Sequence, residues 1–363
     1  MSAITVAAVV DALVVLGMAG PPAPLVVDDE TVAALLAVPP HEGLTALLGA
    51  AVDEGAVEVS EQSRLAITAA WTEVMARCVQ LDVLLHSVST QLSAAGIQHR
   101  ALKGAAVACL DERSPAWRSY SDVDVLVPDG SLLAAARALV ALQLRPLVAP
   151  VSDRWAERFA KSLTLVHPSG AQVDLHRLLA PGVFGLRVVQ KSLFEGEVEF
   201  TLGDVSVKAL DAPRRFLHAC YHASLGGVRG PRHRRDVLLL AGSVRVDDIA
   251  ARWGDGWSPV VVADALDGAI ETGAALSEEW AAWRRSVSLD QADRAVLATY
   301  AGGFGDQAGA AVRAAPGVRT TLAYAWPLFW PSRAHLRSRG RSRGQHLRSV
   351  VRPRVLRLLR RPS

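Results

Sequence analysis

Lysine, glycine and aspartate residues in one stretch of the chain have the types and spacing for phosphoryl chemistry. Lys103 and Gly104 follow an apolar segment and open a predicted short helix, whose backbone N–H groups can bind a phosphate. Asp122 and Asp124 follow in an apolar segment. Side chains at i and i+2 of a strand share one face, about 6.5–7 Å apart. Such a pair can hold divalent cations about 3.5–4 Å apart, as two-metal phosphoryl transfer requires.

A third carboxylate lies downstream in another apolar segment, Val173-Asp174-Leu175-His176. Asp174 alternates with the apolar side chains beside it, so a strand placed next to the first brings Asp174 to the same cations. The alternative is that Asp122 and Asp124 mark a strand end whose acids face water. Unpaired acids on an interior strand are costly. We therefore favour a functional acid cluster.

The elements around these residues predict an α+β fold with a small mixed sheet and helices on one side of it. Apolar residues at three- and four-residue steps predict a long helix that Gly96 ends, and Pro168-Ser-Gly170 predicts a hairpin turn. The expected helices cover residues 66–95, 103–110, 131–142, 211–225, 231–241, 246–253, 258–285 and 290–302, and the expected strands cover 97–102, 120–127, 163–166 and 172–176. The predicted organisation is an N-terminal helical region (1–64), a core (65–210), a C-terminal helical region (211–325) and a basic tail (326–363).

The overall composition is typical of a protein with two or three domains and no membrane span. The 363 residues are 50% hydrophobic, but we find no run of 18 apolar residues. The N-terminus lacks a basic segment, and Asp11 interrupts its apolar run, so we predict no signal peptide. Three widely spaced cysteines without a metal-type pair indicate the reducing cytoplasm.

The net charge of +3 hides an uneven distribution. Residues 331–363 contain eleven arginines and no acid, which leaves 28 basic against 36 acidic residues in residues 1–330. The tail therefore predicts an anionic partner, which is RNA, a membrane surface or the acidic body of the protein itself. A solvated tail is the alternative. Lysine is rare, with four against 35 arginines, so Lys103 inside the glycine turn stands out.

These motifs resemble those of the bacterial uncharacterised nucleotidyltransferase family, within the DNA polymerase β-like nucleotidyltransferase superfamily. The resemblance rests on Leu102-Lys103-Gly104 at the turn, on Arg118 and Ser121 before the acid pair, and on Asp174-Leu175-His176. It covers residues 65–245 well. It implies a nucleotidyltransferase-like fold and the transfer of a nucleoside monophosphate (NMP) from a nucleoside triphosphate (NTP) to an unidentified small molecule, peptide, protein or RNA.

The resemblance also implies roles for individual residues. Asp122 and Asp124 would bind two Mg²⁺ or Mn²⁺ ions, and Asp174 would bridge one of them and activate the acceptor. Lys103 and Gly104 would approach the triphosphate, and Arg118 and Ser121 would belong to the cofactor-binding set. In one departure from the superfamily pattern, Ala105 and Ala106 replace a phosphate-binding serine.

Two other readings stay open, the first because of that departure and the second because the aspartate pair could also hold a metal-bound sugar nucleotide. The first is a catalytically inactive protein on the same fold that binds a nucleotide or a partner. The second is a metal-dependent glycosyltransferase, which the sequence supports least because it lacks a long preceding α/β nucleotide-binding region.

Several further residues are candidates for the walls of the cleft. His176 belongs to the third-acid strand, and His218 and His222 are four residues apart on one predicted helix. Such a pair can bind zinc, but no third ligand is obvious, so we favour packing or cleft lining. Arg235 and Asp236 belong to a basic helix start that opposes the helix dipole. Phosphate contact is one reading of that basic turn, and solvation is the other.

Overall fold

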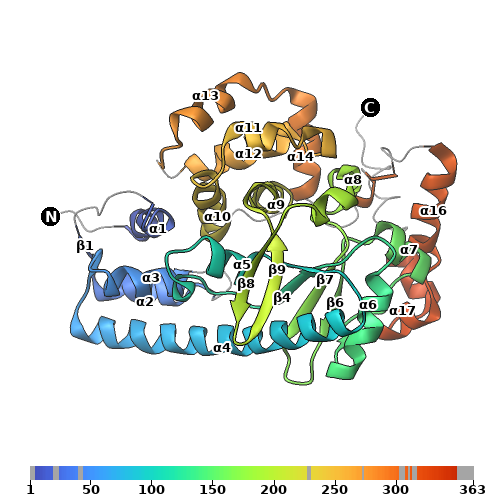
Figure 1. The fold of residues 1–363 in the computed structure, drawn as a ribbon, viewed down its shortest axis with the longest axis horizontal. Helices are drawn as coiled ribbons and strands as arrows, with labels where there is room; N and C mark the ends of the chain where they lie inside the picture. The colour runs from blue at the N-terminus through green and yellow to red at the C-terminus, as the bar shows by residue number, and fades with distance from the viewer. Residues whose placement is uncertain are drawn as a thin grey trace.

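The computed structural model describes residues 5–18, 24–39, 44–226, 230–271, 274–301, 307–309, 311–312 and 317–349. A seven-stranded sheet lies at the centre of these residues (Figure 1). From one edge to the other its strands are β5 (Arg145–Pro146), β6 (Ser162–Val166), β7 (Gln172–His176), β4 (Val123–Leu126), β3 (Arg100–Leu102), β9 (Val205–Leu210) and β8 (Glu197–Leu202).

The sheet is mixed, as the sequence predicted. β4 runs parallel to β7 and antiparallel to β3, and β3 runs parallel to β9. The hairpins β6–β7 and β8–β9 complete the sheet. The first hairpin confirms the sequence prediction. The second was not predicted.

Helices cover both faces of the sheet, so the prediction of helices on one side is wrong. Alternate residues of β4 point to opposite faces, and both faces are apolar. Val125 packs with α4 (Glu61–Ala94) and α6 (Leu132–Ala138). Leu126 packs with α9 (Ala212–Leu225), α10 (Pro231–Ala241) and α12 (Pro259–Ile270). Figure 1 shows α4 running along one side of the sheet and these later helices on the other.

The long helix α4 begins earlier than predicted because Ser60 caps it. The Ser60 hydroxyl accepts a hydrogen bond from the Ser63 N–H at 3.1 Å, and Glu61 lies in the first turn, where a negative charge suits the helix dipole. Gly96 follows the end of the helix with a φ of 69°, as its residue type predicted. The N-terminal elements pack against the first half of α4. They are α1 (Val6–Val14), β1 (Leu25–Val26), α2 (Asp29–Leu36), α3 (Leu44–Asp53) and β2 (Val57–Glu58).

Shorter elements complete the connections. The predicted helix over 258–285 is two helices, because Ser277 starts the second by accepting a hydrogen bond from the Trp280 N–H. The remaining elements are α5 (Lys103–Leu110), η2 (Pro115–Trp117), η3 (Leu139–Leu142), α7 (Asp153–Phe159), α8 (Gly182–Arg187), η4 (Gln190–Phe194), α11 (Val246–Ala250), η5 (Trp253–Asp255), α13 (Glu278–Ser286) and α14 (Gln291–Ala301).

The described C-terminal segment packs beside α7. α16 (Gly317–Phe329) continues past residue 326, and α17 (Arg333–Ser338) follows it (Figure 1). The Ser332 N–H donates to the Val151 carbonyl at 2.7 Å, so backbone hydrogen bonds attach this part of the tail. Residues 350–363 of the predicted basic tail lie outside the described residues. No described helix combines the length and apolar character needed to cross a membrane. The division into four regions stays a prediction.

Candidate active site

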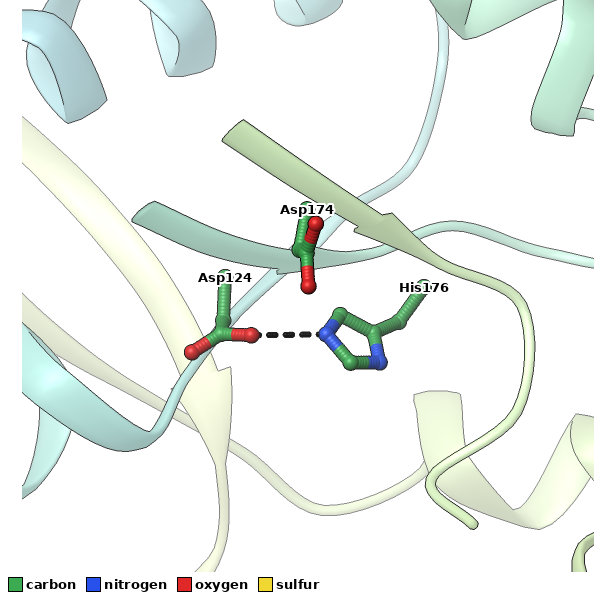
Figure 2. Close-up of side chains that lie close together, drawn as sticks. All are labelled: Asp124, Asp174 and His176. Carbon is green, nitrogen blue, oxygen red and sulfur yellow. Dashed lines mark hydrogen bonds and ion pairs between the residues drawn. The ribbon is translucent and has the colours of Figure 1, made fainter. Parts of the chain in front are cut away.

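Asp124 and Asp174 lie side by side on two neighbouring strands. β4 and β7 are parallel, and their register pairs Asp124 with Asp174 and Leu126 with His176. Asp124, Asp174 and His176 therefore share one face of the sheet, and each offers a ligand atom within 4.8 Å of the others. Figure 2 shows the three side chains converging. The pairing brings together residues that are 50 positions apart in the sequence.

Two donors share one oxygen of the buried Asp124 carboxylate. Lys103 Nζ lies 2.8 Å and His176 Nε2 lies 2.7 Å from Oδ1. Burial opposes the charged carboxylate, but Lys103 and His176 hold the pKa of Asp124 well below its usual range. Burial also lowers the pKa of His176, so the neutral imidazole donates from Nε2 and orients the carboxylate. Among the described residues no other hydrogen bond reaches the Asp124 carboxylate, which leaves Oδ2 for a ligand.

Asp174 is positioned by the hairpin strand beside it. β6 pairs with β7, and the Thr164 hydroxyl donates to Asp174 Oδ1 at 2.5 Å. Because the hydroxyl fixes one oxygen, the other can bind a ligand next to Asp124.

Asp122 lies one residue before β4 and outside the cluster of converging ligand atoms. Burial, and then repulsion from Asp124, raises its pKa to about 6. Within the described chain its only hydrogen-bond partner is the exposed Ser121 hydroxyl, at 3.5 Å. The expectation that Asp122 and Asp124 share one strand is therefore wrong, since the strand begins at Val123. Its charge nevertheless acts on Asp124.

Lys161 is a site residue that our sequence analysis missed. It directly precedes β6, and its carbonyl accepts hydrogen bonds from the N–H groups of Arg177 and Leu178, just after β7. Burial, and then repulsion from Lys103, lowers its pKa to about 8 although Asp124 and Asp174 lie nearby. The scarcity of lysine was a usable signal, because it applies to Lys161 as well as to Lys103.

Arg232 is a second cation near the acids. The charges of Asp122 and Asp124 reach its guanidinium, while burial and Arg118 lower its pKa. Lys161 and Arg232 form no ion pair within the part of the chain that the structure describes. Both remain available to an anion.

The glycine turn has an unusual backbone at Lys103. Its φ of 42° is left-handed, which costs a non-glycine residue about 1–2 kcal/mol. Gly104 is needed for packing, because a Cβ there would lie 2.9 Å from Cγ of Tyr120. Tyr120 is held in turn by its hydroxyl, which donates to Asp82 on α4. No side chain caps the first turn of α5, so the backbone N–H groups of that turn are available to a ligand.

The comparison with known families agrees with this geometry. Residues 28–248 match the family described as uncharacterised nucleotidyltransferase. The chain belongs to this family. The match includes the glycine turn, the three acids, Lys161 and the start of α10.

Other comparisons add less to the nucleotidyltransferase assignment. The crystal structure of an antigenic nucleotidyltransferase-like protein from Paracoccidioides brasiliensis is similar over 58% of this chain and 95% of that chain, with 12% identity and a TM-score of 0.35. No curated protein matches the sequence.

A separate network of buried ion pairs contains three further candidate residues, Arg118, Arg235 and Asp236. Arg118 binds both carboxylate oxygens of Asp236. Arg235 binds both oxygens of Glu112, and its Nη1 also donates to backbone carbonyls at the end of α1. Arg215 binds Asp111 in the same two-pronged way. The network ties the β3–β4 connection to α9 and α10. These guanidinium groups are already occupied by carboxylates.

The two histidines of α9 lie over the site face of the sheet. His218 is buried, and its Nε2 has no hydrogen-bond partner within the described chain. His222 stacks edge-on against His233 of α10, with ring centroids 4.5 Å apart. Burial, and then Lys103, lowers the pKa of both His218 and His222 well below the usual range. Neutral histidines here suit the lining of a cleft.

The donor set fits a hard divalent cation. Carboxylate oxygens are the protein ligands that Mg²⁺ prefers. Asp124 and Asp174 each keep one carboxylate oxygen free of described hydrogen bonds. Burial, and then the charge of Asp124, disfavours the ionised form of Asp122, and a bound cation would favour it. The acid cluster thus has ligand atoms suited to a divalent cation.

Proposed function

We propose that the protein transfers an NMP from an NTP to an acceptor hydroxyl or phosphate, with divalent cations held by the acid cluster. One observation carries this proposal. Carboxylates lie close enough to Lys161 and Arg232, two cations without ion pairs among the described residues, for their charges to act on one another. A metal–triphosphate complex carries positive charge on the metal, which suits the carboxylates, and negative charge on the phosphates, which suits the cations. Membership of the nucleotidyltransferase family supports the reaction class.

The carboxylates would hold two cations, with Mg²⁺ as the expected ion and Mn²⁺ as its substitute. Asp124 and Asp174 supply oxygens from adjacent strands, and Asp122 supplies a third carboxylate beside them. Bound cations in such a site neutralise phosphate charge and stabilise the attacking and leaving oxygens. As part of this proposal, the protein would belong with the DNA polymerase β-like nucleotidyltransferases, and the acid cluster supports that assignment.

The cations and the turn would bind the triphosphate. Lys161 and Arg232 offer charged donors, and the uncapped first turn of α5 offers backbone N–H groups. Lys103 lies between the two sets, because its ammonium pairs with Asp124 while its backbone opens α5. These contacts replace the serine hydroxyl that the turn lacks.

In the proposed reaction, the acceptor oxygen forms a bond to the α-phosphorus while the bond from that phosphorus to the oxygen bridging to the β-phosphate breaks. Pyrophosphate leaves with the electron pair of the broken bond. For a hydroxyl acceptor, the Asp174 carboxylate takes the proton. An in-line geometry of this kind depends mainly on positioning and charge.

Transfer of a radioactive label tests the proposal. The protein is incubated with each of the four α-³²P-labelled NTPs, Mg²⁺ and a cell extract as the source of acceptor. We expect label to enter a product with one or more NTPs, and to be absent with EDTA or with Asp122→Ala/Asp124→Ala. Label transfer that is missing for the wild type, or equal in the double variant, contradicts the proposal.

A second candidate function is a non-catalytic protein that binds a nucleotide or a partner on the same fold. The observation in its favour is that Ala105 and Ala106 are buried, at 6% and 0% exposure, where a serine would contact phosphate. Calorimetry separates the two functions. NTP binding that ignores EDTA, together with no turnover, favours the binding protein.

We also propose a partner for the arginine-rich tail and a cellular compartment for the protein. The arginine-rich tail would contact an anionic partner, and Cys78, Cys109 and Cys220 are free thiols, which suits the reducing cytoplasm of a bacterium. RNA as the acceptor would make binding depend on the tail and on salt concentration.

A further inference from the structure

A cavity of about 390 Å³ is lined in part by Lys161, on which the charges of Asp124 and Asp174 act. Lys161 and Ser162 at the start of β6 form one wall, and His222 of α9 lies on another. The segment after β7 contributes Leu179 and Ala180. Sites for small molecules typically occupy about 300–1,000 Å³, so the volume suits a ligand of one or two rings.

Aromatic side chains build another wall of the cavity. Trp155 and Phe159 of α7 and Tyr324 of α16 pack together, with ring centroids 5.2–6.3 Å apart. Trp155 Nε1 donates to the Tyr324 carbonyl at 3.0 Å, which fixes the indole. A rigid aromatic wall of this kind favours a flat apolar ring. Tyr324 lies beyond residues 28–248, so part of the cavity comes from outside the family match.

The charge of the residues that line the cavity limits the class of ligand that it can bind. Lys161 is a cation, whereas no aspartate or glutamate is among the described residues that line the cavity. A cationic ligand would be repelled by Lys161 and would meet no carboxylate among the described lining residues. A neutral or anionic ligand meets no such penalty.

We propose that this cavity holds the acceptor, a small ring-bearing hydroxyl compound that is neutral or negatively charged. This inference rests on the proposed function, because it assigns the acceptor side of the same site. The ring lies against Tyr324 and its neighbours, and the reacting hydroxyl lies at the Lys161 end, toward Asp124 and Asp174. The bond changes are those given for the transfer step.

Three probes with the same phenol ring and different charge test the inference by ligand-observed NMR titration. They are tyramine (cationic), tyrosol (neutral) and 4-hydroxyphenylacetate (anionic), each titrated without NTP or metal. We expect tyrosol and 4-hydroxyphenylacetate to bind the wild type saturably, at least about tenfold more tightly than tyramine. Tightest binding by tyramine, or no saturable binding by any probe, overturns the inference. This order is measured on the wild type and does not depend on the folding of any variant.

Variants then locate the bound probe. Tyr324→Leu should weaken binding of the neutral and anionic probes about tenfold, whereas Trp326→Leu, on the exposed side of the same helix, should not change it. Lys161→Gln should abolish the preference for the anion over the neutral probe. Equal binding by Tyr324→Leu and the wild type, with both folded by circular dichroism, also overturns the inference.

The binding result is separable from the proposed reaction. Probe binding in the expected order without any label transfer supports the cavity and contradicts the transferase. Label transfer without probe binding supports the transferase and contradicts the cavity as the acceptor site.

Discussion

Two groups of buried charges lie close together in this protein and are organised in opposite ways. In the network around Arg118, three arginines each bind one carboxylate through two hydrogen bonds. In the acid cluster, Lys103 binds Asp124 directly, whereas Lys161 and Arg232 lack ion pairs in the described chain. The first arrangement satisfies its own charges and holds elements together. The second leaves charges of both signs for a ligand.

This difference shows how to decide which buried charges belong to a functional site. Both groups combine carboxylates with cations and include buried residues, and the sequence placed members of both among the site candidates. The hydrogen-bond geometry separates them, because a two-pronged pair leaves little capacity for a substrate. The predictions below test the separation from each side.

The largest expected effect is on stability, in the paired network. Asp236→Ala leaves the Arg118 guanidinium buried without its partner, which costs about 3–5 kcal/mol of unfolding free energy. Urea denaturation measures the loss. The control Glu73→Ala removes an exposed pair with Arg77 and should change the free energy by under about 0.5 kcal/mol. Equal effects of the two substitutions would remove the distinction between network and surface.

The next effect is on activity, in the acid cluster. Asp174→Asn keeps the shape of the side chain and the oxygen that accepts from Thr164, so the fold should persist. We expect NMP transfer to fall about 10²–10³-fold, as when one group that stabilises a transition state is removed. The initial rate with saturating NTP and Mg²⁺ measures this. Activity within tenfold of the wild type would exclude a central role for Asp174.

A smaller effect, with the opposite sign to the Asp236 prediction, is expected at Asp122. Because its folded pKa of about 6 exceeds the usual 3.8, the unfolded chain loses this proton first as pH rises. The free energy of unfolding therefore falls between about pH 4 and pH 6, and ionised Asp122 keeps it low above pH 6. Asp122→Asn should raise the unfolding free energy at pH 7 by about 1–3 kcal/mol in EDTA, and the gain should fade near pH 4. Destabilisation at pH 7 would mean that Asp122 is paired like the network acids.

The smallest effect concerns the charge of Lys161. Its pKa of about 8 means that the free protein loses this positive charge between pH 7 and pH 9. Affinity for Mg²⁺–NTP should fall about tenfold across that interval. Lys161→Arg should bind with a flatter pH profile, because a guanidinium stays charged. Parallel profiles for the two proteins would show that Lys161 does not contact the phosphates.

Local patterns predicted those parts of the fold that depend on neighbouring residues. The body of α4 and its end at Gly96, the hairpin around Gly170 and the short helix after Lys103 all follow from turn residues and apolar spacing, whereas the Ser60 cap of α4 was not predicted. The hairpin β8–β9 had a readable pattern too, with alternating side chains on either side of Gly203. We did not predict it. The break between α12 and α13 was not predicted, because Ser277, which caps α13, is a single residue within a long helical pattern.

The candidate site was only partly readable, because its geometry comes from strand pairing. The sequence supplied Asp124 and Asp174, but only the parallel register of β4 and β7 sets them side by side. Lys161 lies at the cluster because its backbone pairs with the segment after β7, and no local sequence pattern predicts that pairing. Conversely, Arg118 and Asp236 are 118 residues apart, so their pairing could not be foreseen.

The most direct test is calorimetric titration of the protein with each NTP, in Mg²⁺ and in EDTA. Wild type, Asp124→Asn/Asp174→Asn and Glu73→Ala are compared. We predict that at least one NTP binds the wild type and Glu73→Ala only with Mg²⁺, and that the double variant loses this binding. NTP binding of equal strength in EDTA, or unchanged in the double variant, would contradict a metal–nucleotide site at the acid cluster.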